Sequence, residues 1–329
     1  MSETLPVQAD LDAPRLLEAY RTMRTIRAFE DRVHEEFASG DIPGFVHLYA
    51  GEEASATGVC MHLDERDTIA STHRGHGHCI AKGVDPVPMM AEIFGRRTGC
   101  CHGKGGSMHI ADLSKGMLGA NGIVGGGPPL ICGTALAAKL QGSGGVAVAF
   151  FGDGASNQGT TMEALNLASV WNLPAIFVAE NNGYAEATAS VWSVSADNIA
   201  DRAGGFGMPG VIVDGFDFFA VHEAAGEAIR RAREGSGPTL LEMKFTRYYG
   251  HFEGDAQTYR GEEVADARAR LDCLARFRAR VIETGDVAAE QLDRIDEDVV
   301  ALIDRAVAEA RAAAKPTADD LVTDVYVSY

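Results

Sequence analysis

Apolar residues recur at spacings of three and four between residues 12 and 39, where Tyr20, Met23, Ile26 and Phe29 stand among charged neighbours. That spacing places them on one face of a helix, which would be buried against the rest of the chain. Similar patterns predict further helices over residues 50–62, 88–94, 129–140, 264–283 and 288–314.

Short segments of strand length separate these helices. Two of them, Val146 to Phe151 and Pro174 to Ala179, carry no charged residue and predict strands that are buried on both faces. Residues 67–72, 211–213 and 239–245 predict three more strands. The alternation of strands and helices indicates an α/β fold with a doubly wound, mostly parallel sheet.

Neither an internal repeat nor a convincing linker divides the chain. We therefore predict a single domain over residues 1–329, with an N-terminal helical extension over residues 1–45 and a C-terminal helical extension and tail over residues 262–329. Glycine is dense between Thr98 and Gly127. So long a loop in a compact domain is usually functional, and glycine lets the backbone approach a bound ligand closely.

The chain has 329 residues and a formal net charge of −18. Such an acidic chain is poorly suited to a nucleic acid backbone or an anionic membrane, so we expect neither partner. No apolar run approaches the roughly 18 residues of a membrane-spanning helix. Residues 1–12 lack the pattern of a leader, and the scattered cysteines are typical of reduced thiols, so we expect a cytoplasmic protein.

Polar residues follow both of the uncharged strands. Asp153 comes shortly after the first strand and Asn182 shortly after the second. Because parallel strands bring such loops to one edge of the sheet, the two side chains should face one site. A helix opening near Ser156 would favour a phosphate at its N-terminus, which Asp153 would repel unless a cation such as Mg²⁺ lay between them. The alternative is that both residues merely form turns.

Two other kinds of site are compatible with parts of the sequence. The glycines over residues 142–145 and around Gly152 suggest a dinucleotide-binding loop, but they lack the Gly-x-Gly-x-x-Gly spacing. The histidines of residues 73–78, with Cys79 and residues 100–102, could nominally bind zinc, but their spacing is irregular for such a site. Both readings rank below the Mg²⁺ and phosphate site.

The string Gly152-Asp153-Gly154-Ala155, followed at this distance by Asn181-Asn182-Gly183-Tyr184, resembles the thiamine-diphosphate motif. The surrounding residues resemble the alpha subunit of the first component of 2-oxo acid and acetoin dehydrogenase complexes. The resemblance implies a thiamine-diphosphate-binding fold. It also implies that Mg²⁺ is held by the side chains of Asp153 and Asn182 and by the backbone carbonyl of Tyr184.

Other segments extend the resemblance along the chain. It implies that Arg74 and His251 contact the diphosphate, and that His73 or His76 lies near the reacting carbon. It implies catalytic roles for His251, His76 and His47. Contacts to the cofactor are implied for His73, Arg74, Gly122, Val124, Gly152, Asp153, Gly154, Ala155, Asn182, Tyr184, Ala185 and His251.

The family also requires a glutamate from a second, pyrimidine-binding domain, for which this chain has no room. The resemblance therefore implies a separate beta subunit in an α2β2 heterotetramer, without which the chain is inactive. His73 and the pair Ala185-Glu186 resemble the acetoin-cleaving branch, which passes a two-carbon unit to a lipoyl-bearing acyltransferase. The alternatives are decarboxylation of pyruvate or another 2-oxo acid, and a non-catalytic scaffold.

Overall fold

A computed structural model describes residues 11–326 of the chain. The expectation about a leader over residues 1–12 therefore falls almost wholly outside the described residues. Among the helices that are described, none is both long enough and apolar enough to cross a bilayer.

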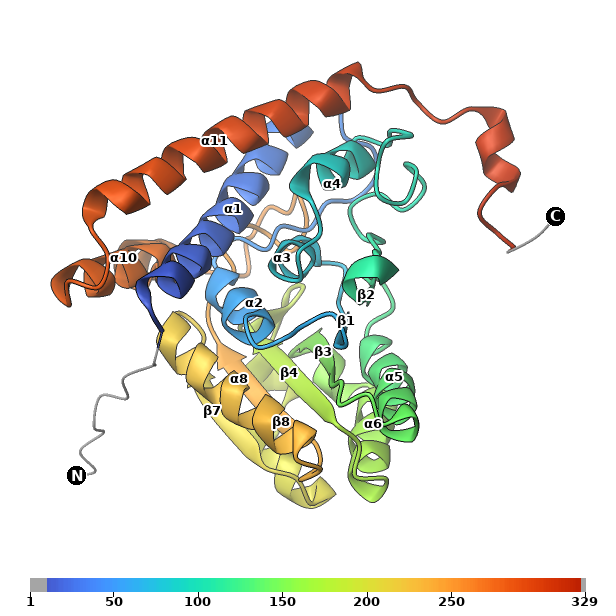
Figure 1. Cartoon of the computed structure of the whole chain (residues 1–329), viewed down its shortest axis with the longest axis vertical. Coiled ribbons are helices and arrows are strands. Elements are labelled where there is room, and N and C mark those ends of the chain that lie inside the picture. The colour runs from blue at the N-terminus through green and yellow to red at the C-terminus, as the bar shows by residue number, and fades with distance from the viewer. Residues whose placement is uncertain (1–10, 327–329) are drawn as a thin grey trace.

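A six-stranded parallel sheet forms the centre of the molecule (Figure 1). Its strands, in spatial order, are β2 (Met117–Gly119), β1 (Thr68–Ala70), β3 (Ala147–Gly152), β4 (Ala175–Asn181), β8 (Thr239–Lys244) and β7 (Gly210–Asp214). Strands β3 and β4 pair in register from Ala147 opposite Ala175 to Gly152 opposite Glu180. The loops that follow these two strands therefore leave the sheet at the same edge.

Helices cover both faces of this sheet. Alternate residues of β3 and β4, such as Phe150 and Val178, join a core with α2 (Glu53–Cys60) and α8 (Phe218–Arg233). The intervening residues, such as Phe151 and Phe177, join a second core with α5 (Gly127–Gln141) and α6 (Gly159–Val170). A sheet buried on both faces explains why these strands carry uncharged runs, and it confirms the predicted doubly wound α/β fold.

Further helices lie outside the layer that contains α2. Helix α1 (Ala13–Ala38) packs against α2 and against α11 (Ala289–Ala312), and α11 also crosses α4 (Pro86–Ile93) (Figure 1). The helix α1 begins where the Asp12 side chain accepts a hydrogen bond from the Arg15 amide. The division into one domain with two helical extensions stays a prediction.

The remaining elements are short or lie at the surface. They are α3 (His76–Ala81), α7 (Ser190–Ser193), α9 (Glu263–Arg270), α10 (Cys273–Glu283), a hairpin of β5 (Tyr184–Ala185) and β6 (Thr188–Ala189), and the 3-10 helices η1 (Leu113–Lys115), η2 (Ala155–Asn157), η3 (Ala200–Phe206) and η4 (Ala318–Val322).

The structure departs from the sequence predictions at several elements. The single helix predicted over residues 264–283 is two helices, because Asp272 interrupts the first and caps α10 by accepting a hydrogen bond from the Ala275 amide. Helices α3 and α8 and the strand β2 were not predicted. The glycine-rich segment over residues 98–127 is otherwise irregular, as expected, with only η1, β2 and the first residue of α5 in regular structure.

Candidate functional site

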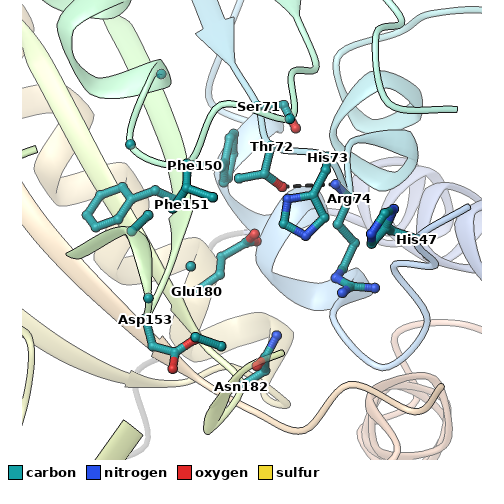
Figure 2. A pocket seen from close by; sticks show the side chains of 18 of the residues that line it. His47, Ser71, Thr72, His73, Arg74, Phe150, Phe151, Asp153, Glu180 and Asn182 are labelled. Carbon is teal, nitrogen blue, oxygen red and sulfur yellow. Dashed lines mark hydrogen bonds between the residues drawn. The ribbon is translucent and has the colours of Figure 1, made fainter. Parts of the chain in front are cut away.

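A cavity of about 410 Å³ lies where the parallel strands end at their carboxyl edge (Figure 2). Loops that follow β1, β3, β4 and β8 meet there, as ligand sites do in open α/β sheets. Segment 121–128, which leads into α5, completes the wall. The side chains that face the cavity include those of His47, Glu52, His73, Arg74, Val124, Asp153, Glu180, Asn182, Arg247 and His251.

Asp153 presents an unpaired carboxyl oxygen to this cavity. The residue is only 2% exposed, and its Oδ2 atom has no hydrogen-bond partner among residues 11–326. Burial raises the pKa of the Asp153 carboxyl to about 6, because a charge is poorly solvated there. A buried carboxylate without a partner is costly unless a cation neutralises it, so this atom has the property expected of a metal ligand.

The two asparagines that follow β4 have different surroundings. Asn181 points away from the cavity, and its Nδ2 donates to Glu242 at 2.8 Å. Asn182 lines the cavity, with Nδ2 donating to Glu52 Oε1 at 3.0 Å and Oδ1 accepting from the Tyr184 amide at 3.3 Å. The structure thus brings Asn182, and not Asn181, to the same space as Asp153 (Figure 2).

The third predicted metal ligand, the Tyr184 carbonyl, already accepts a hydrogen bond from Arg247 Nη1 at 3.1 Å. A carbonyl oxygen has two lone pairs, so this bond leaves one for a cation. Arg247 is fully buried and also donates to the Glu186 carbonyl at 3.3 Å and to Tyr259 Oη at 2.6 Å. Sequence reasoning missed Arg247, although its position just after the end of β8 was a usable signal.

Arg74 is held as a buried cation at the cavity wall. Its Nη1 donates to the Leu48 carbonyl at 2.6 Å and its Nη2 to the His251 carbonyl at 2.9 Å. Burial lowers the pKa of Arg74 to about 10, so the guanidinium stays charged at neutral pH. Together, Arg74 and Arg247 give the cavity two fixed positive charges that suit a phosphate group.

Glycines open the remaining walls to a ligand. A Cβ atom added at Gly122 or Gly152 would have no protein atom within 4 Å, so both backbones border open space. Gly154 differs, because a Cβ there would lie 2.6 Å from the Cβ of Ala185. Ala155, which begins η2, and Val124 also line the cavity.

Three histidines from different segments form a cluster at the cavity. The ring centroids of His47 and His73 are 4.6 Å apart, and the ring of His251 lies 5.1 Å from the first and 5.2 Å from the second. No hydrogen bond from residues 11–326 reaches these rings, and His47 Nδ1 is buried without a partner. Their ring nitrogens are therefore available to a ligand.

The histidines of this cluster are neutral at physiological pH. Burial, followed by the nearby charge of Arg74, lowers the pKa of His47 to about 3, that of His251 to about 4 and that of His73 well below its ordinary value. A neutral imidazole offers both a donor and an acceptor nitrogen. Two buried guanidinium groups facing the same cavity make a divalent metal on these histidines electrostatically unfavourable.

Of the residues predicted for the site, His76 is the one that does not line the cavity. It opens helix α3 with a side chain that is fully buried in the core. Its Nδ1 lies 3.0 Å from Glu30 Oε2 and its Nε2 lies 3.0 Å from Ser107 Oγ, so both ring nitrogens are engaged. The structure therefore places His73, and not His76, at the cavity.

Two buried acids at the cavity were also missed. Glu180, near the end of β4, accepts hydrogen bonds from Tyr49, from Ser55 at 2.8 Å and from His78 at 3.1 Å. Glu52 is 1% exposed, and burial, with Glu180 next, raises the pKa of its carboxyl to about 8. A run of two glutamates at residues 52 and 53 gave no sign of which one faces a site.

Several known proteins are similar to this chain over nearly its whole length. The family model described as the dehydrogenase E1 component matches residues 21–319. The alpha subunit of acetoin:2,6-dichlorophenolindophenol oxidoreductase from Cupriavidus necator is 67% identical over 320 residues, which cover 97% of this chain and 96% of that protein. The Bacillus subtilis protein of the same name is 58% identical with the same coverage. The pyruvate dehydrogenase E1 component subunit alpha of Zymomonas mobilis is 42% identical over 98% of this chain and 92% of its own length.

Proposed function

Because the chain belongs to the dehydrogenase E1 component family, we propose that it is the alpha subunit of a thiamine-diphosphate-dependent component that cleaves acetoin. The products are acetaldehyde and a two-carbon unit that passes to lipoamide. The observation that carries this proposal is the cavity, which combines an unpaired buried Asp153, the fixed cation Arg74 and the neutral histidine cluster. Two relatives named for an acetoin oxidoreductase support the choice of substrate.

The residues present fit a magnesium-bound diphosphate. Asp153 Oδ2, Asn182 Oδ1 and the free lone pair of the Tyr184 carbonyl would hold Mg²⁺, which prefers such oxygen ligands. Arg74 and His251 would contact the diphosphate. Other residues that line the cavity would contact the rest of the cofactor. They are His73, Gly122, Val124, Gly152, Gly154, Ala155 and Ala185.

Thiamine diphosphate, when bound, would supply a nucleophilic carbon for the substrate carbonyl and a sink for the electron pair of the bond that breaks. The histidine cluster suits an uncharged substrate such as acetoin. When its central carbon–carbon bond breaks, the hydroxyl-bearing carbon becomes an aldehyde and its O–H proton must leave. A neutral nitrogen of His47 or His251 can accept that proton.

Pyruvate or another 2-oxo acid is the alternative substrate, and the relative from Zymomonas mobilis supports it. A 2-oxo acid carries a carboxylate that the guanidinium groups of Arg74 and Arg247 would attract. Its decarboxylation releases CO₂ and requires no base at a hydroxyl group. The neutral histidines are thus the feature that favours acetoin.

The proposal includes a beta subunit in an α2β2 heterotetramer, without which the chain is inactive, and a lipoyl-bearing acyltransferase. Ile123 and Val124, at the cavity rim, leave apolar surface exposed that a second subunit would cover. Six free cysteines support a reducing compartment, and we propose the cytoplasm.

Binding of thiamine diphosphate by the reconstituted complex of this chain and its beta subunit tests the proposal. Equilibrium dialysis should show binding that requires Mg²⁺ and is lost on chelation. Absence of binding in the assembled pair would instead support a non-catalytic scaffold.

A further inference from the structure

The side-chain amide of Asn182 ends in two groups, an oxygen and an NH₂, that are similar in size but opposite in hydrogen-bonding character. Its oxygen can bind a metal ion, whereas its NH₂ group can only donate hydrogen bonds. The terminal torsion of asparagine is broad, so rotation by a half-turn exchanges the two groups at small steric cost. If Asn182 binds Mg²⁺ as proposed above, some neighbour has to select the productive orientation.

Two neighbours of Asn182 each require the same orientation. Glu52 Oε1 is an acceptor 3.0 Å from Nδ2, and the Tyr184 amide is a donor 3.3 Å from Oδ1. The Glu52 carboxyl, whose pKa burial raises to about 8, accepts at Oε1 when its proton is on Oε2. In that state, rotation of the amide would place NH₂ against an N–H donor and its oxygen against an acceptor oxygen. The contact to Glu52 is the shorter one, and the Tyr184 contact is long for a hydrogen bond, so Glu52 contributes most of the preference.

The position of Glu52 leaves its carboxyl group free to orient the Asn182 amide. It precedes the first residue of α2, yet its side chain makes no hydrogen bond to the free amides of that helix. Instead the carboxyl group, which is almost fully buried, faces the cavity and contacts Asn182. The backbone before it is also fixed, because Gly51 has a φ of +98° and lies directly against Thr246 and Tyr248.

We propose that Glu52 is a positioning residue, which holds the Asn182 amide so that its oxygen faces the Mg²⁺ site. This inference rests on the proposed function. It assigns to Glu52 an effect on metal affinity and not a part in the chemical steps. Loss of the hydrogen-bond partner of a metal ligand typically weakens metal binding 10- to 100-fold.

The test measures the Mg²⁺ concentration that half-saturates thiamine diphosphate binding by the reconstituted complex, using equilibrium dialysis. Glu52→Met removes the acceptor and should raise this concentration at least tenfold, whereas excess Mg²⁺ should restore full binding. Glu52→Gln keeps an acceptor oxygen and should stay within about twofold of the parent. Glu52→Leu replaces the Met variant if that variant does not fold.

The chain offers a matched control in the neighbouring asparagine. Asn181 donates to the buried Glu242 at 2.8 Å, in a pair of the same kind that does not face the cavity. Glu242→Met, which removes the acceptor of this second pair, should leave the half-saturating Mg²⁺ concentration unchanged. A general loss of stability would instead affect both variants and would persist in excess Mg²⁺.

A change at Asn182 itself distinguishes orientation from other effects. Asn182→Asp presents an oxygen on both faces, so Glu52→Met should cause no further loss in that background. The proposal is overturned if Glu52→Met leaves the Mg²⁺ requirement unchanged, if Glu52→Gln raises it equally, or if the loss persists with Asn182→Asp. Failure of the parent complex to bind Mg²⁺ and thiamine diphosphate would instead refute the proposed function.

Discussion

At the scale of single residues, the site contains buried polar groups that lack hydrogen-bond partners. Asp153 is a buried carboxyl group with an unpaired oxygen, and His47 is a buried imidazole with an unpaired nitrogen. Neither group stabilises the fold by itself, because burial of an unpaired polar group costs free energy. Their placement is explained by a ligand that supplies the missing partners.

The first prediction concerns the metal ligand. Asp153→Ala should weaken Mg²⁺-dependent binding of thiamine diphosphate by at least 100-fold, because it removes the one anionic ligand proposed for the ion. The apo protein should stay folded and at least as stable as the parent, since an unpaired buried carboxyl is lost. Cofactor binding and thermal unfolding are measured together. Unchanged binding would refute the ligand assignment.

The second prediction concerns pH. The folded chain keeps His47 and His251 neutral down to a pKa of about 3 and about 4, whereas the unfolded chain protonates them near pH 6.5. Between these limits the unfolded state binds more protons at these two histidines, so their contribution to the free energy of unfolding falls as pH decreases from about 6.5 to about 4.

Chemical denaturation at a series of pH values checks this pH dependence. His47→Gln should make the free energy of unfolding less sensitive to acid, whereas His109→Gln, which changes an exposed histidine outside the cluster, should not. Equal acid sensitivity in the parent and in His47→Gln would contradict the assignment of a neutral, buried imidazole.

At the scale of elements, the sequence predicts those parts of the site that depend on local pattern. Uncharged runs identify β3 and β4, and their parallel pairing brings Asp153 and Asn182 to one edge. Helix α8 was missed although the sequence does mark it, because Val221, Ala225 and Ile229 recur at the spacing of one buried helix face. The side chain of His76 points into the core because His76 begins helix α3. No capping side chain in the local sequence marks the start of this helix.

Site residues that come from distant segments could not be predicted from the local sequence pattern either. Glu52 reaches the site from the start of α2, and its contact to Asn182 spans 130 positions of sequence. Arg247 acts through backbone carbonyls that become its partners only when the β5–β6 hairpin folds. Such contacts follow from the tertiary arrangement and not from residue spacing.

A third prediction tests how closely two of these elements pack. Gly154→Ala would place a Cβ 2.6 Å from that of Ala185, so it should force the hairpin away from the loop after β3. We expect a loss of about 1–3 kcal/mol in unfolding free energy, together with weaker cofactor binding. Ala185→Gly should restore both in the double variant. Failure of this rescue would contradict the packing that the structure shows.

At the scale of the whole molecule, the cavity is open where a partner is expected. Ile123 is 76% exposed although it lines the cavity, and Trp192, in α7 after the β5–β6 hairpin, is 86% exposed. Large exposed apolar side chains such as these are typical of a protein interface. Under the proposed function, the chain would supply the diphosphate side of the site and leave the opposite side for another subunit.

The fourth prediction addresses this assembly. Ile123→Glu should weaken association with the beta subunit by tenfold or more, since it places a charge in an apolar interface. Val300→Glu changes an exposed apolar residue on α11 and should leave association unchanged. Analytical ultracentrifugation of the mixed subunits measures both effects. Equal association of the parent and Ile123→Glu would place the beta subunit elsewhere.

Product analysis of the reconstituted complex tests the central claim most directly. The complex, with Mg²⁺, thiamine diphosphate and oxidised lipoamide, is supplied with acetoin or pyruvate in parallel assays. We predict that acetoin yields acetaldehyde and acetylated dihydrolipoamide in equal amounts, and that pyruvate reacts at least tenfold more slowly. Turnover of pyruvate with no release of acetaldehyde from acetoin would contradict the claim.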